Sequence, residues 1–139
     1  MYTHIMTPVD LTHADRLDKA LRVAADLSKH YDAPVTYVGV TTATPSQLAH
    51  TPQEYGRKLE AFVADQVAAH GHKGEAKVMV AHDPTIDLDD NLLKGIDEVG
   101  ADLVVVASHI PGVSDHIWPS NGGTLASHAH ASVLVVRSE

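Results

Sequence analysis

Residues 101–109 read ADLVVVASH, and this stretch decides the fold. Its centre, LVVV at residues 103–106, is apolar at every position. A strand with one face in water alternates apolar and polar residues, whereas an unbroken apolar run indicates a strand covered on both faces. The run therefore predicts a central strand of a parallel sheet that lies between two layers of helices.

Four more short runs rich in β-branched residues precede or follow this one, at residues 4–9, 35–40, 76–81 and 132–137. Between the runs, apolar residues recur at three- and four-residue steps, as on one face of a helix. We expect these helices at about residues 12–31, 51–70, 88–99 and 120–129. Regular alternation of strand and helix is typical of a doubly wound α/β fold. No linker divides the 139 residues, so residues 1–139 are expected to form a single domain.

Some helix ends carry capping signals. TPQE at residues 51–54 places a Thr at the N-cap, Pro at the first helical position and Glu at the third. Thr12 followed by Asp15 resembles a capping box for the first helix. Gly71 is the expected stop of the second helix.

Composition excludes several classes of protein. The chain has no cysteine, which rules out disulfide scaffolds and thiolate chemistry, and its formal net charge of −8 disfavours nucleic acid and anionic membranes as partners. Its first residues lack the basic and apolar regions of a signal peptide. The longest strongly apolar run, residues 103–107, is too short to cross a bilayer. We therefore expect a cytoplasmic protein.

Four segments resemble the universal stress protein (UspA) family. IMTPVD at residues 5–10 resembles its first strand, and residues 101–109 resemble its fourth strand with the start of its phosphate loop. Residues 131–137 are similar to its closing strand, and Asp83-Pro84 resembles a Gly-x-Pro element after its third strand. The segments follow in the family's order and spacing along essentially the whole chain.

The resemblance implies a Rossmann-like sheet of five parallel strands in the order 3-2-1-4-5. It also implies a homodimer that forms through the last strand, from Ser132 to Arg137. An apolar strand with no sequence after it to cover its edge invites pairing with a second copy. The alternative is an edge protected by a helix or a loop.

Many members of the family bind ATP, and doubly wound folds hold ligands beyond the carboxyl ends of their strands. On the base side, the resemblance implies that Asp10 accepts a hydrogen bond from the adenine amino group, with Pro8, Val9 and Val40 lining the base. The alternative for Asp10 is a cap or turn residue after the first strand.

On the phosphate side, the family pattern is Gly, two residues, Gly, about nine residues, then Gly-Ser/Thr. Here Ala107, Ile110 and Pro119 stand at the three glycine positions. SHIP at residues 108–111, followed later by Ser-Asn, resembles a subset of the family with a loop one residue shorter. The positions implied to contact phosphate are Ala107, Ser108, His109, Ser120, Asn121 and Gly122.

Proline at position 119 removes an N–H donor and fixes φ at about −65°. A hydrogen bond to a charged group contributes about 1.5–3 kcal/mol, so its loss weakens binding about 10- to 100-fold. Residues 120–123 still offer backbone donors at a helix start, although Ser120 alternatively only caps that helix. We expect ATP, with its Mg²⁺, to bind weakly or not at all.

The function expected is that of a small stress-response regulator without enzymatic activity, whose adenine-nucleotide cleft has a degraded phosphate loop. One alternative is a genuine ATP binder that hydrolyses slowly or phosphorylates itself, with Ser120 as acceptor. Another is an enzyme that uses the same cleft for a metal or a metabolite. Neither a Gly-x-Ser-x-Gly elbow nor a Gly-x-Gly-x-x-Gly turn after the first strand is present.

No metal site is predicted. The pairs His70/His72 and His128/His130 have i, i+2 spacing, which points the rings to different faces of a helix, so surface histidines are expected. The acidic run at residues 83–90 indicates the negative first turn of a helix. The alternative for that run is a divalent ion beside a phosphate.

Overall fold

Five strands form one all-parallel sheet in the order β3-β2-β1-β4-β5, which confirms the predicted doubly wound topology. The computed structural model describes residues 1–45, 49–82, 84–108 and 122–137. The strands are β1 (Ile5–Pro8), β2 (Val35–Thr42), β3 (Gly74–Ala81), β4 (Leu103–Ala107) and β5 (Ser132–Val136).

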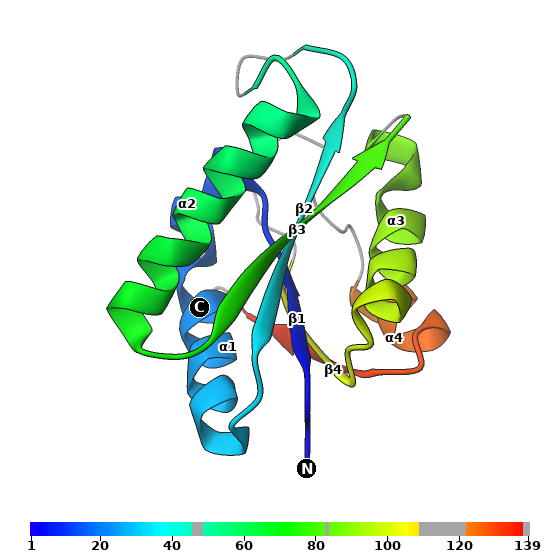
Figure 1. The fold of residues 1–139 in the computed structure, drawn as a ribbon. Helices are drawn as coiled ribbons and strands as arrows, with labels where there is room; N and C mark the ends of the chain where they lie inside the picture. The colour runs from blue at the N-terminus through cyan, green and yellow to red at the C-terminus, as the bar shows by residue number, and fades with distance from the viewer. Residues whose placement is uncertain (46–48, 83, 109–121, 138–139) are drawn as a thin grey trace.

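Helices cover both faces of this sheet, with α1 and α2 on one side and α3 and α4 on the other (Figure 1). Their bounds are α1 Asp18–Tyr31, α2 Pro52–His70, α3 Pro84–Val99 and α4 Gly122–His128, and a 3₁₀ helix η1 spans Leu11–Leu17. All five residues of β4 are buried, as its unbroken apolar run predicts. Within the described ranges, no helix combines the length and the hydrophobicity that crossing a membrane requires.

The ends of α2 form as expected. The Thr51 hydroxyl accepts a hydrogen bond from the Glu54 N–H at 3.1 Å, and the Glu54 carboxylate accepts one from the His50 N–H at 3.2 Å. Gly71 ends the helix in the left-handed conformation, with φ of 74°. A side chain at that φ is strained, which is why the helix stops at a glycine.

The start of the first helix was predicted wrongly. Asp10, not Thr12, is the N-cap, because its carboxylate accepts a hydrogen bond from the Thr12 N–H at 3.0 Å. The chain then forms η1, which is kinked at His13, and the regular α-helix begins only at Asp18. An aspartate just after a strand competes well for the N–H two residues on, so the helical turn is capped two residues earlier than expected.

Other boundaries also differ from the prediction. The third helix starts at Pro84 rather than near Leu88, since proline fits the first turn of a helix. Strand β3 starts at Gly74, earlier than predicted, although glycine disfavours strands. A side chain at this position would contact Val67 of α2 and Tyr37 of β2, so glycine fits best.

His72 corrects the expectation of surface histidines. It is only 6% exposed, and its Nε2 lies 2.6 Å from the hydroxyl of the fully buried Tyr37. Burial, together with the nearby charges of His70 and Lys29, lowers the pKa of His72. His72 is therefore buried against Tyr37 rather than lying on the surface.

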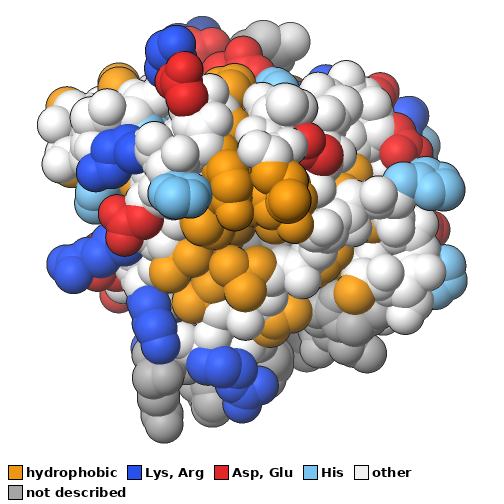
Figure 2. Space-filling view, turned by 90° about the horizontal axis from the view of Figure 1, so that it is seen from below, with side chains coloured by type: hydrophobic (Ala, Val, Ile, Leu, Met, Phe, Trp, Pro, Cys, Tyr) orange, Lys and Arg blue, Asp and Glu red, His pale blue; other side chains and the backbone are white. Residues whose placement is uncertain are grey.

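The chain's first residues lie at the amino ends of the strands. On this face, hydrophobic side chains gather near the middle and charged and histidine side chains lie toward the rim (Figure 2). The Tyr2 ring packs edge-on against Tyr31 of α1, with ring centroids 5.2 Å apart. The Tyr2 hydroxyl donates to the Ser132 hydroxyl of β5 at 3.0 Å. The N-terminal segment thus joins α1 to the last strand.

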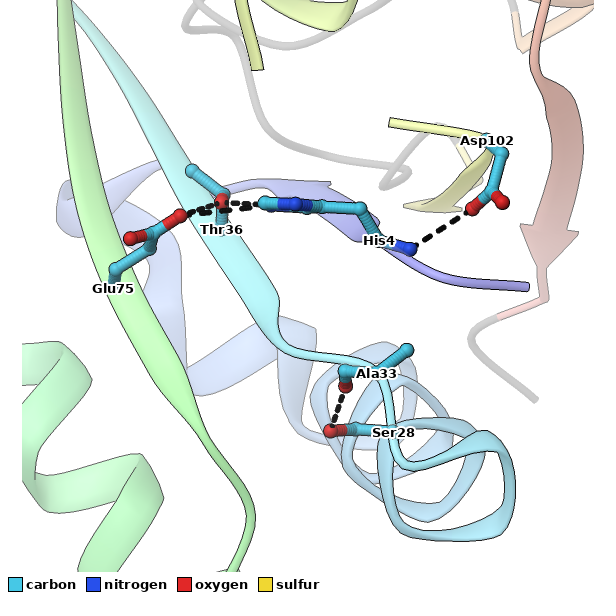
Figure 3. Close-up of polar contacts among 6 residues, drawn as sticks. All are labelled: His4, Ser28, Ala33, Thr36, Glu75 and Asp102. Atoms are coloured by element: carbon cyan, nitrogen blue, oxygen red, sulfur yellow. Dashed lines mark hydrogen bonds and ion pairs between the residues drawn. The ribbon is translucent and has the colours of Figure 1, made fainter. Parts of the chain in front are cut away.

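A polar cluster holds the same end of the sheet (Figure 3). The Asp102 carboxylate, just before β4, accepts hydrogen bonds from the N–H groups of Thr3 and His4 at 2.9–3.1 Å. His4 Nε2 lies 2.6 Å from the Thr36 hydroxyl, which donates to Glu75 at 2.8 Å. The cluster therefore links β1, β2, β3 and the start of β4.

Asp102 makes stability depend on pH. Burial alone would raise its pKa, but the hydrogen bonds from His4 and Thr3 outweigh burial and hold the pKa below the ordinary value of 3.8. A carboxyl group with a depressed folded pKa stabilises the fold above its unfolded pKa, and this contribution is lost as the pH falls through the folded pKa.

We predict that Asp102→Asn lowers the free energy of unfolding by about 1 kcal/mol at neutral pH, since these hydrogen bonds to a charged group are partly exposed to solvent. Urea denaturation at pH 7 and at pH 3 measures the loss, which should shrink at the lower pH. Asp26→Asn, on the exposed side of α1, is the control and should change neither value. An equal loss for Asp102→Asn at both pH values would contradict the assignment.

Candidate functional site

Strand β1 lies at the point where the strand order reverses, with β2 paired on one side of it and β4 on the other. The helices that follow β1 and β4 in the described residues, α1 and α4, lie on opposite faces of the sheet, and in such folds ligands bind beside this point. Asp10 follows β1 at this point, and Ser108 follows β4. Each is less than 10% exposed.

The structure brings the predicted base-side residues together. Pro8 ends β1, and the Val9 N–H donates to the Val38 carbonyl of β2 at 2.8 Å, so the chain stays beside β2 as it leaves the sheet. Val9 and Val40 belong to one apolar cluster and are 5% and 7% exposed. Asp10 follows directly.

The predicted phosphate-side residues are described only in part. Ala107 pairs with Val136 in β5, and the Ser108 N–H donates to the Val136 carbonyl at 2.8 Å. Gly122 is the first residue of α4. His109, Ser120 and Asn121 lie outside the described residues, as do Ile110 and Pro119. The shortened loop accordingly stays a prediction.

Both oxygens of the Asp10 carboxylate have a donor from the chain. Oδ1 accepts from the Thr12 N–H at 3.0 Å, and Oδ2 lies 2.8 Å from Nδ1 of His13. The alternative reading of Asp10 as a cap residue is therefore correct for its local structure. An ionised carboxylate has about four acceptor positions, so two protein donors leave acceptor capacity for a ligand.

Tyr55 is a neighbour of this site that helical spacing alone does not reveal. Tyr55 of α2 is only 4% exposed, and its hydroxyl end lies over Gly39 of β2. Burial, and then the negative charge of Asp10, raises the pKa of Tyr55. A signal was present in the sequence, because a glycine inside an apolar strand often marks a close approach.

The arrangement provides a negatively charged acceptor next to apolar walls. Such a site can recognise a flat, partly apolar ligand that carries an amino group. Within the described ranges, no group of three or more His, Asp or Glu side chains is placed to hold a metal ion. Of the acidic run noted in the sequence, Asp87, Asp89 and Asp90 fall in the first half of α3, and Asp83 lies outside the described residues.

Comparison with known proteins identifies the family. The model of the universal stress protein family matches residues 1–137. Universal stress protein G of Shigella flexneri is 30% identical over 148 residues, which cover 99% of this chain and all of that protein. The protein of the same name from Escherichia coli O157:H7 gives the same values. The chain belongs to the universal stress protein family.

Solved structures share the fold. A universal stress protein in complex with cAMP superposes with a TM-score of 0.71 at 21% identity, and the match covers 99% of both chains. The universal stress protein of Archaeoglobus fulgidus in complex with dAMP has a TM-score of 0.65 at 23% identity, over 96% of this chain and 97% of that one.

We predict that Gly39→Ala destabilises the fold by about 1–3 kcal/mol, as overpacking of a core does. The added methyl carbon would lie 2.7 Å from Cε1 of the Tyr55 ring and would force the ring to move. Gly95→Ala in α3 is the matched control, since its methyl carbon would lie 3.6 Å from its nearest neighbour, Met6. Urea denaturation compares the two, and equal stabilities would show that Tyr55 does not pack on Gly39.

Proposed function

We propose that this chain is a single-domain cytoplasmic stress-response regulator that binds an adenine nucleotide between β1 and β4 and does not turn it over. The observation that carries the proposal is the buried Asp10 carboxylate, oriented at the reversal of strand order beside Val9 and Val40. Relatives of this fold support it, since solved universal stress proteins are in complex with cAMP, with dAMP and, in one from Arabidopsis thaliana, with AMP.

Base recognition follows from the chemistry of these groups. The adenine ring is a flat apolar surface, and the branched side chains of Val9 and Val40 would remove it from water. Its exocyclic amino group is a donor, and the Asp10 carboxylate can only accept. A hydrogen bond to a charged acceptor is about twice as strong as one between neutral groups. This contact would therefore orient the base and favour ligands that carry the amino group.

Phosphate recognition is expected to be weak. Glycines let a backbone approach phosphate oxygens closely, and this chain has Ala107, Ile110 and Pro119 where the pattern of the ATP-binding members has glycine. Proline also lacks the N–H that would donate. The β- and γ-phosphates of ATP should therefore add little to the affinity that the base and the first phosphate provide.

We predict that AMP and Mg²⁺–ATP bind with dissociation constants within about threefold of each other, both weaker than the low micromolar range. Isothermal titration calorimetry measures both. A low-micromolar constant for ATP, or ATP binding more than tenfold tighter than AMP, would show an intact phosphate site and favour the ATP-hydrolysing or self-phosphorylating alternative.

Two variants test the base side and the phosphate side of the site separately. Asp10→Asn keeps one oxygen to cap Thr12 but loses the second acceptor, so AMP binding should weaken by about tenfold. Pro119→Gly restores an N–H donor and should tighten ATP binding by about tenfold while changing AMP binding less. If Asp10→Asn left AMP binding unchanged while Pro119→Gly altered it more than ATP binding, the proposed position of the base beside Asp10 would be wrong.

We further propose a homodimer that forms through β5. Among the described residues, β5 pairs with β4 alone, and its side chains Leu134 and Val135 are 39% and 38% exposed. An apolar edge strand of this kind is a template for pairing with a second copy.

We predict that the chain sediments with twice the mass of one copy and that Val135→Lys produces monomers, since a buried unpaired charge is costly. Val80→Lys is the matched control, because Val80 is a 52% exposed valine of β3 at the other edge of the sheet. Sedimentation velocity at several concentrations distinguishes the two variants. A monomeric parent chain, or a dimer that persists in Val135→Lys, would contradict the proposed interface.

A further inference from the structure

His13 contacts Asp10 twice. Its ring nitrogen Nδ1 lies 2.8 Å from Oδ2 of the carboxylate, and its backbone N–H donates to the Asp10 carbonyl at 3.1 Å. The His13 side chain is 22% exposed and that of Asp10 is 7% exposed, so the contact is largely shielded from water. Shielding strengthens such a contact.

The kink in η1 makes these contacts possible. His13 alone in η1 departs from helical geometry, with φ of −122° and ψ of 29°. The chain thus turns at the residue whose ring reaches back over three positions to Asp10. An ordinary helix start would need only the Thr12 N–H as a cap partner for Asp10, and that bond is already made. The His13 contact is additional to capping.

The contact indicates which nitrogen of the His13 ring carries the hydrogen. An ionised carboxylate can only accept, so Nδ1 of His13 carries the hydrogen in this contact. With Thr12 on one oxygen and His13 on the other, both ends of the carboxylate are held. The χ2 angle of an aspartate is otherwise broad, so two donors reduce its freedom considerably.

A held carboxylate discriminates between ligands better than a loose one. A 6-aminopurine places an N–H donor toward it, whereas a 6-oxopurine places an acceptor there, and two acceptors repel. A carboxylate that can rotate lets a water molecule bridge to the oxo group, which removes much of the penalty. Fixing the carboxylate therefore increases the difference in affinity between 6-aminopurine and 6-oxopurine nucleotides.

We propose that His13 is a positioning residue of the nucleotide site, which holds the Asp10 carboxylate so that the site selects 6-aminopurine over 6-oxopurine nucleotides. This inference rests on the proposed adenine-nucleotide function. His13 acts through Asp10.

The test is a pair of variants that separate the N–H donor from the ring. His13→Phe keeps a ring of similar size without a donor, and His13→Asn keeps an amide N–H near the position of Nδ1 without the ring. His30→Ala, an exposed histidine of α1, is the control for loss of a histidine. Calorimetry with AMP and with IMP gives the ratio of dissociation constants for each protein, and circular dichroism melting confirms that each is folded.

We expect the parent chain to bind AMP at least about tenfold more tightly than IMP, the ratio to fall to about threefold or less in His13→Phe, and His13→Asn and His30→Ala to keep it. If His13→Phe does not fold, His13→Ala replaces it.

Selectivity that survives loss of the donor in a folded variant overturns the role of His13 while the nucleotide function stands, as does a parent chain that binds AMP and IMP equally. A parent chain that binds neither nucleotide overturns the proposed function, and the role of His13 with it.

Discussion

The burial of β1 and β4 on both faces is the constraint on which the rest of the structure depends. These two strands lie side by side in the middle of the sheet, and nearly every residue in them is inaccessible to water. Both faces must then be covered, which places α1 and α2 on one side and α3 and α4 on the other (Figure 1). The reversal of strand order falls beside β1, so the end of that strand becomes the natural place for a ligand.

The two ends of the sheet divide the work of this fold. At the amino ends, Asp102 and the contacts of His4 with Thr36 tie the strands together with hydrogen bonds of the chain itself (Figure 3). At the carboxyl ends, Asp10 is held by Thr12 and His13 but keeps acceptor capacity. Asp102 precedes a strand, and its hydrogen bonds stabilise the fold. Asp10 follows a strand, and its carboxylate can still accept a hydrogen bond from a ligand.

The sequence predicted the fold class and most element positions, because unbroken apolar runs and helical spacing report burial directly. The strand order was implied by the resemblance to the universal stress protein family. The sequence did not predict the 3₁₀ turn after β1, since the bond from Asp10 to the Thr12 N–H is a local competition that apolar spacing does not reveal. Tyr55 over Gly39 and the buried His72 also escaped prediction, because both depend on how α2 crosses the sheet. The base-side residues were found through family resemblance, and their grouping needed the structure.

The central claim is that an adenine nucleotide binds at the end of β1 beside Asp10. Titration of the ¹⁵N-labelled chain with AMP, followed by amide chemical shifts, tests it most directly. The account predicts saturable shifts at Val9, Asp10 and His13, with none at Asp102 on the opposite end of the sheet. Shifts confined to other parts of the chain, or no shifts at millimolar AMP, would contradict it.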